Sequence, residues 1–204
     1  MKKTLLCLAS FVVSLSGFQG VAAAAVDTSA IPADAKWMVQ VDFVALRESP
    51  VGRELLDMAE KNADLKLPSA SVKIDVRKVL ATVESATAYG TVFSKNPDLV
   101  DGTLLIKGTD ELRKIAEAVV TQASISQPDT VAELKGLPFP AYVIKGKVTI
   151  AFPPEPVVLV SRSQPQLLKA YDLYRGKGPS SARAQSSLKA MAPQNRPLIV
   201  FAAS

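Results

Sequence analysis

The chain has 204 residues, of which 48% are hydrophobic and 21% are charged, and its net charge at pH 7 is +5. It contains no histidine and one cysteine, Cys7. These counts exclude Ser-His-Asp and Cys-His nucleophile systems, and also zinc, copper, haem and iron–sulfur sites with their usual ligands. Only an oxygen-ligand site for calcium or magnesium is left. The length suits one domain with a sizeable core, or one domain plus an extension.

Residues 1–25 have the pattern of a secretory signal peptide. Met1 to Lys3 form a positive n-region and Thr4 to Phe18 an apolar h-region, and small residues follow. We predict cleavage near Ala24 or Ala25, and export to the periplasm or the extracellular space. The mature chain would have no cysteine, so its core alone must stabilise it. An uncleaved membrane anchor is the alternative, because the uncharged stretch is long enough to span a bilayer.

A polar, proline-broken lead-in is predicted for residues 26–35, before the first strand. From Trp37 to Phe43 apolar and polar residues alternate, which is typical of a half-buried strand with Val39 and Val41 facing inward. Beyond this strand, Ser49 is suited to the N-cap of a helix that continues to about residue 65.

The rest of the chain divides into short periodic segments separated by turn residues. Gly90 lies inside one predicted strand and indicates a bulge or a close backbone approach. The predicted elements are a helical turn capped by Asp75, strands over 83–93 and 102–107, a helix from Thr109 or Asp110, an edge strand over 131–134, a three-stranded meander over 141–161, a helix from Ser163 to Gly176, and an apolar run over 197–203.

This order of elements predicts an α+β fold, an antiparallel sheet with helices packed on one face. Its first part, β-α-β-β-α-β, is the split β-α-β or ferredoxin-like order. We expect residues 36–175 to form the domain, and residues 176–204 to form a basic linker, a short helix and a final strand. That final strand either closes the sheet or begins a second repeat.

The segments IPADAKWMVQVDFVALRESPVG, ATAYGTVF, GTLLIKGTDELRKI and LLKAYDLYRGKGPS together resemble an uncharacterised family of secreted bacterial proteins, known as a domain of unknown function. The resemblance covers about residues 36–204 and consists of core and turn patterns. It implies an exported α+β domain, sometimes in two similar halves, and it implies no catalytic residues.

Few motifs in the sequence carry chemistry. Ser186 and Lys189 match the S-x-x-K pattern of penicillin-binding serine enzymes, but no S-D-N or K-T-G accompanies them, which favours a chance match. Asp98 and Asp101 share a loop in which apolar residues interrupt the spacing of a calcium site, so turn chemistry is the better interpretation.

Paired carboxylates of a glycoside hydrolase would need two acids facing each other across a cleft. The sequence brings no two acids together, and Asp42 at a strand end is better suited to backbone capping. The acids on or beside predicted strands are Asp42, Asp75, Glu84, Glu133 and Glu155.

Nucleotide fingerprints are absent, and the few aromatics beside the basic segment argue against nucleic acid as a partner. Residues 173–204 contain five basic residues and no acid, typical of a solvated tail, although they could meet an acidic surface.

We therefore expect an exported, non-catalytic domain without cofactor, metal or catalytic residue. Its partner would be an unknown protein, an envelope polymer or a copy of itself. The alternative is a carboxylate- or lysine-dependent hydrolase acting on envelope polymer or peptide. Membrane contact is expected only through an uncleaved signal or the basic C-terminal segment.

Overall fold

The computed structural model describes residues 28–62, 76–94, 100–182 and 199–203. Several predictions concern positions outside these residues: the signal peptide with its cleavage at Ala24 or Ala25, and the roles of Asp75, Asp98, Ser186 and Lys189.

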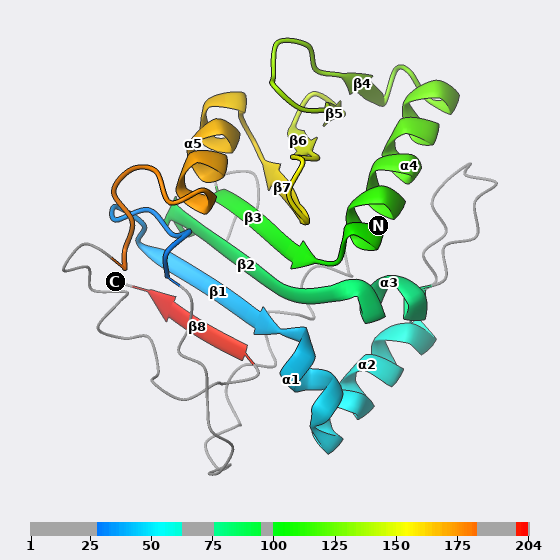
Figure 1. The fold of residues 1–204 in the computed structure, drawn as a ribbon, viewed down its shortest axis with the longest axis vertical. Coiled ribbons are helices and arrows are strands. Elements are labelled where there is room, and N and C mark those ends of the chain that lie inside the picture. The colour runs from blue at the N-terminus through cyan, green and yellow to red at the C-terminus, as the bar shows by residue number, and fades with distance from the viewer. Residues whose placement is uncertain (1–27, 63–75, 95–99, 183–198, 204) are drawn as a thin grey trace.

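Within the described residues, the chain forms one eight-stranded sheet in which all neighbouring strands are antiparallel (Figure 1). The strand order is β4-β5-β6-β7-β3-β2-β1-β8. The elements are β1 (Trp37–Asp42), α1 (Phe43–Glu48), α2 (Pro50–Asn62), α3 (Val76–Thr82), β2 (Val83–Val92), β3 (Asp101–Gly108), α4 (Asp110–Ser126), β4 (Val131–Glu133), β5 (Ala141–Ile144), β6 (Val148–Ala151), β7 (Val157–Ser161), α5 (Gln164–Tyr174) and β8 (Ile199–Ala203).

The strongest sequence signals are confirmed. The meander is present as β5, β6 and β7, and its first turn has Lys145 at φ 51° and Gly146 at φ 64°, the left-handed geometry that suits a tight hairpin. Ser163 caps α5 by accepting a hydrogen bond from the Gln166 backbone N–H at 3.4 Å. Gly176 follows α5 with φ 75°, as a C-terminal glycine should.

The apolar alternation of the first strand continues to Phe43, but Phe43 begins the short helix α1. The Asp42 carboxylate accepts a hydrogen bond from the Ala45 backbone N–H at 2.8 Å, which ends β1 and begins α1. Ser49 then accepts from the Gly52 N–H at 2.8 Å, so it caps α2 as predicted.

No helix of the described residues is long and apolar enough to cross a membrane.

The elements follow one another along the chain as predicted, β-α-β-β-α-β, but the ferredoxin-like (split β-α-β) strand pairing is not present among the described strands. It would require a crossover between the first two strands, whereas β1 and β2 are antiparallel neighbours with Asp42 opposite Ser85. Helix α1 starts directly after β1, and α3 ends directly before β2. The chain therefore leaves and re-enters the sheet at the same end, and α1 to α3 form a long hairpin connection.

The prediction that the helices pack on one face is also wrong. Helix α5 packs against Val157 and Leu159 of β7, whereas α4 packs against Val158 and Val160 (Figure 1). Neighbouring residues of a strand point to opposite faces, so the two helices cover opposite sides of the sheet. Strand β7 contains a continuous apolar run, so both of its sides must be covered, and α5 and α4 cover one side each.

The main core lies on the α5 face, and the segment predicted as a polar lead-in contributes to it. Ile31 is fully buried, and its carbonyl accepts from the Ser181 N–H at 2.7 Å. Pro32 forms an isolated bridge with Ser180. The stretches on either side of residues 36–175 thus pair with each other across the α5 face. Strand β8 joins the sheet beside β1, and whether a second repeat follows stays a prediction.

Candidate functional site

The predicted acidic candidates have structural tasks or stand apart. Asp42 caps α1, and the Asp101 carboxylate accepts hydrogen bonds from Thr91 Oγ1 at 2.5 Å and from Gln166 Nε2. Glu84 is exposed on β2 at the same end of the sheet as Asp42, and Glu133 is exposed on the terminal strand β4. These positions form no pair across a described cleft.

Glu155 lies in the connection between β6 and β7 and ties it to α5. Its Oε1 accepts a hydrogen bond from Tyr171 Oη at 3.2 Å and lies 3.6 Å from Arg175 Nε. The Arg175 guanidinium also lies over the Tyr171 ring, 5.7 Å from its centroid. This cluster fastens the end of α5, and it places one charge of the basic C-terminal segment in a structural contact. Within the described ranges, no group of three or more Asp, Glu, Cys or His side chains is arranged to hold a metal.

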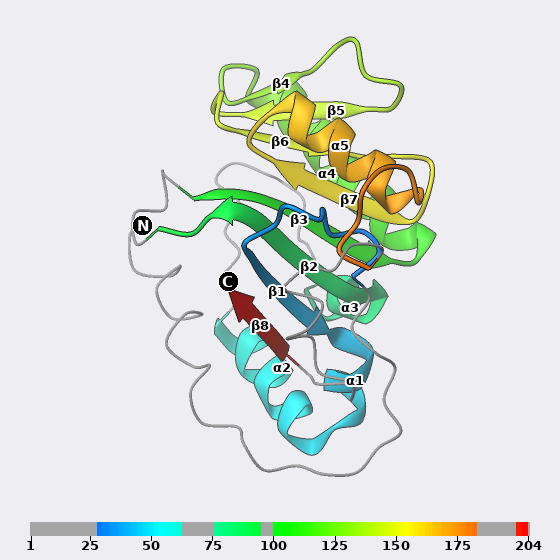
Figure 2. The same cartoon turned by 90° about the vertical axis from the view of Figure 1, so that its left-hand side faces the viewer.

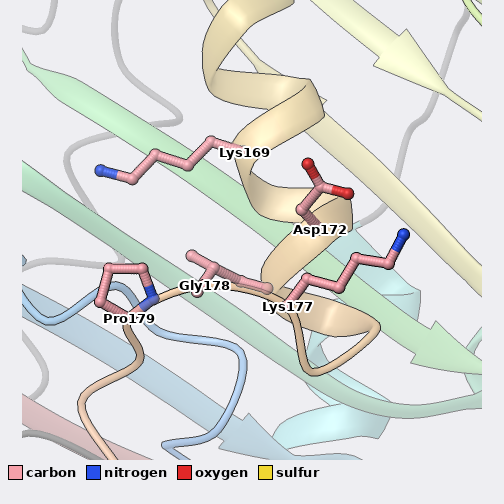
Figure 3. Close-up of a pocket in the computed structure, with 6 residues that line it drawn as sticks. Lys169, Asp172, Lys177, Gly178 and Pro179 are labelled. Carbon is pink, nitrogen blue, oxygen red and sulfur yellow. The ribbon is translucent and has the colours of Figure 1, made fainter.

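A hollow of about 360 Å³ lies beside the C-terminal end of α5 (Figure 3). Lys169 points away from Asp172 and Lys177, and its ammonium pairs with the Asp34 carboxylate at 3.1 Å. A ligand site needs polar groups that converge on one position. These polar groups diverge, so the hollow makes a poor binding site.

The α4 face of the sheet carries the more informative surface. Helix α4 covers this face over β3 and β7, and no described helix packs extensively on β1 or β8. Where the three strands are aligned, from Val41 to Trp37 of β1, the side chains that β2, β1 and β8 place here are all apolar. They are Ala86, Ala88, Trp37, Val39, Val41, Ile199, Phe201 and Ala203. An antiparallel sheet with one solvated face normally alternates apolar and polar residues, so an apolar outer face calls for an explanation.

Trp37 anchors this surface. Its indole lies over Gly90 and Gly102, where a Cβ atom would come within 2.8 and 3.1 Å of the ring. The indole Nε1–H donates to the Val92 carbonyl at 3.0 Å, and the β2–β3 register shifts at this point. Both expectations for Gly90, a bulge and a close approach, are confirmed.

An aromatic row extends from Trp37 to the edge of the sheet. The ring of Phe93 lies 5.8 Å from that of Trp37 and 5.9 Å from that of Phe201, both in edge-to-face contact. Phe93 is 62% exposed, Phe201 46% and Ile199 42%. Together with the exposed Ala203, these side chains form what we call the β8 patch: Phe93, Ile199, Phe201 and Ala203.

Sequence reasoning named none of these residues as functional. Val39 and Val41 were predicted to face the core, but the fully buried residue of β1 is Met38, on the opposite face. An apolar alternation does not reveal which face the main core will cover. The signal that could have indicated the patch is the last apolar run, because a charge-free strand near a chain end is an unusual edge.

No protein-family model and no curated protein matches this chain. Among solved structures it is similar to crystal forms of TP0453. Form III has a TM-score of 0.42 at 14% identity, over 78% of this chain and 54% of that one. Form IV has a TM-score of 0.43 at 13% identity, over 76% and 55%. The chain spans about half the length of these proteins, and so distant a likeness assigns neither family nor function.

Proposed function

We propose that this chain is an exported, non-catalytic domain that binds or assembles with another macromolecule in the cell envelope or extracellular space. The observation that supports this proposal is the β8 patch. Its three large side chains are 42% to 62% exposed, and they adjoin half-buried apolar residues of β1 and β2. Clustered apolar surface of this kind is typical of an interaction site.

The distribution of exposed side chains strengthens the proposal. Of the large hydrophobics that are exposed in the described residues, three gather in the patch and Val92 adjoins one of them, Phe93. The others are spread over helices: Val51 and Met58 on α2, and Ile125 on α4. Single exposed hydrophobics are common and need no explanation. A row of aromatic rings at a sheet edge does, because aromatic side chains supply much of the binding energy in interfaces.

Site-specific photo-crosslinking in producing cells tests the proposal. A benzophenone amino acid replaces Phe201 in one variant and Ile125 in a control, since Ile125 is 71% exposed on α4 and outside the patch. We expect a cross-linked species of higher mass at position 201 and none at position 125. No adduct at position 201, or equal adducts at both, would contradict binding through the patch.

Export is tested by the location and the intact mass of the protein made in the same cells. A chain that begins near Val26 agrees with the proposal, as the small residues before it suit signal cleavage. A full-length chain retained in the cytoplasm would contradict it.

A further inference from the structure

We infer that the partner is a second copy of this chain, which pairs its β8 with β8 of the first copy, edge to edge around a two-fold axis. The inference rests on the proposed function and names the partner that the β8 patch binds. It is carried by the chemistry of the sheet's two edges, the symmetry of the strand and the absence of charge on it.

Strand β8 lacks the charged side chains and the proline that commonly protect an edge from pairing. It is a terminal strand of the sheet, and its sequence, Ile-Val-Phe-Ala-Ala, contains no charge and no proline. Every second residue of an edge strand directs its N–H and C=O away from the sheet, where they can accept another strand. No other described strand lies beyond this edge.

The opposite edge of the same sheet is protected. Strand β4 spans only Val131–Glu133, and it carries the exposed Glu133. Lys135 follows two residues later. Short length and charged side chains are the usual means by which an edge strand avoids pairing. Among the described residues, one edge of the sheet is therefore protected, and the other lacks charge and proline.

A second copy fits the open edge by symmetry. Two antiparallel β8 strands centred on Phe201 place this residue opposite its own equivalent, and Ile199 opposite Ala203 of the other copy. A two-fold axis perpendicular to the sheet keeps the two α4 faces on the same side. The two β8 patches then meet as one apolar surface, and aromatic cross-strand pairs are among the more stabilising.

Charge permits this contact. The chain carries +5 overall, but no ionisable side chain lies on β8. Repulsion between two copies is therefore long-range and is screened at physiological salt, where the Debye length is about 8 Å. Added salt should leave the pairing intact or strengthen it. Contact of the basic C-terminal segment with an anionic polymer would instead weaken in salt.

The strand is short, so the dimer should be weak. Five residues extend only about 17 Å, so few residues of each copy meet in the contact, whereas a standard interface involves about 20–30 residues a side. We expect a dissociation constant between about 1 µM and 1 mM.

Sedimentation equilibrium of the secreted protein tests the inference. We expect a concentration-dependent dimer for the unaltered chain, and loss of the dimer for Ile199→Lys, which puts a charge into the new strand pair. Ile125→Lys is the matched control: it changes the same residue type at another exposed position and should leave the dimer unchanged. A monomer throughout the weak-binding range, or equal loss in both variants, would overturn the inference.

Disulfide formation tests the register, because Cys7 is the only cysteine of the chain. In a Cys7→Ser background, Phe201→Cys should oxidise to a covalent dimer, since directly opposed Cβ atoms lie about 4.5–5.5 Å apart. Ile199→Cys and Ala203→Cys should cross-link when mixed and not alone. Ile125→Cys is the control for random collision. Cross-linking of Ile125→Cys at the rate of Phe201→Cys would overturn the inference.

The inference and the proposed function can fail separately. A monomer that still forms a photo-crosslink at position 201, with a mass other than twice that of the chain, would remove the second copy and keep binding through the patch. A monomer without any adduct at position 201 would remove both.

Discussion

The two ends of the eight-stranded sheet differ in how many faces are covered. At the β4 end, α4 and α5 pack on opposite faces, and Phe152 is only 1% exposed. At the β8 end, the α5 face buries Met38, Val200 and Ala202, whereas the α4 face leaves Phe201 46% exposed. Figure 2 shows β8 and β4 at opposite ends of the sheet. The sheet thus changes along its width from a two-sided core to a one-sided one, while the terminal strand β8 is apolar on both sides.

This difference indicates that the exposed apolar residues at the β8 end, Phe93, Ile199 and Phe201, contribute little to the stability of the fold. The fold is stabilised by the α5 face and by the α4 cover over β3 and β7. Residues that add little to folding and remain exposed are available for binding.

The largest expected contrast is between the two kinds of apolar site. Leu159→Ala empties a fully buried position between β7 and α5 and should lower the free energy of unfolding by about 2–5 kcal/mol. Phe201→Ala should cost only about 1 kcal/mol, the order of one aromatic pair. Urea unfolding of both variants measures the difference. Equal losses would show that the β8 end is as much a part of the core as β7.

Gly90→Ala should disturb the packing of the Trp37 indole on β2, and with it the contact between Trp37 and the β8 patch. A Cβ atom there overlaps the Asp101 carbonyl oxygen and lies 2.8 Å from the indole. We expect a loss of about 1–3 kcal/mol in unfolding free energy. Gly102→Ala, with the ring at 3.1 Å, should cost less. Because Trp37 is the only tryptophan, its fluorescence reports the change directly, and an unchanged spectrum for Gly90→Ala would contradict the packing.

The sequence predicted elements far better than it predicted their pairing. The meander, α4 and α5 were each marked by local periodicity and caps, which a single segment contains. The strand order depended on whether α1 to α3 cross the sheet, and no local pattern encodes that. Phe43 shows the same limit: it continued an apolar alternation, yet capping by Asp42 began a helix.

The pH dependence of stability tests whether Tyr89 is buried on the α5 face of the sheet. Burial raises the pKa of Tyr89 above its ordinary value of 10, although its hydrogen bond with Thr103 opposes the shift. Tyr89 ionises near pH 10 in the unfolded chain but not in the folded one. The protonated, buried Tyr89 therefore makes its full contribution to the unfolding free energy below pH 10, and this contribution is lost above pH 10. We expect the unfolding free energy to fall by up to about 1.4 kcal/mol per pH unit above pH 10. Thermal unfolding of Tyr89→Phe should show a weaker fall, and an identical pH profile would contradict the burial.

The smallest expected effect lies outside both ends of the sheet. Ser49→Ala removes the side chain that accepts from the Gly52 N–H and should cost about 1 kcal/mol. Helix α2 exposes Val51 (37%) and Met58 (51%), so loss of the cap should loosen this helix without altering association through β8. Circular dichroism and sedimentation of the variant check both statements. A weaker dimer in Ser49→Ala would show that α2 takes part in the interface.

The last apolar run indicates two residues of the β8 patch, Ile199 and Phe201, but the sequence does not show that Phe93 joins them. Phe93 is far from Ile199 and Phe201 in the chain, and only the β1–β8 pairing and the ring contacts of Phe93 with Trp37 and Phe201 bring them together. The acids named from sequence form no paired site among the described residues. Residue type alone suggested them, and it does not show which partner each acid has in the fold. Glu155, for example, holds Tyr171 and Arg175.

Hydrogen exchange of the two terminal strands tests the central claim most directly, since β4 serves as an internal control for β8 within one sample. The purified protein is measured well below and well above the dissociation constant found by sedimentation. Pairing through β8 predicts that its amides gain protection as concentration rises while those of β4 do not change. Protection that is independent of concentration in β8, or that rises equally in both strands, would contradict an open edge at β8 and a protected one at β4.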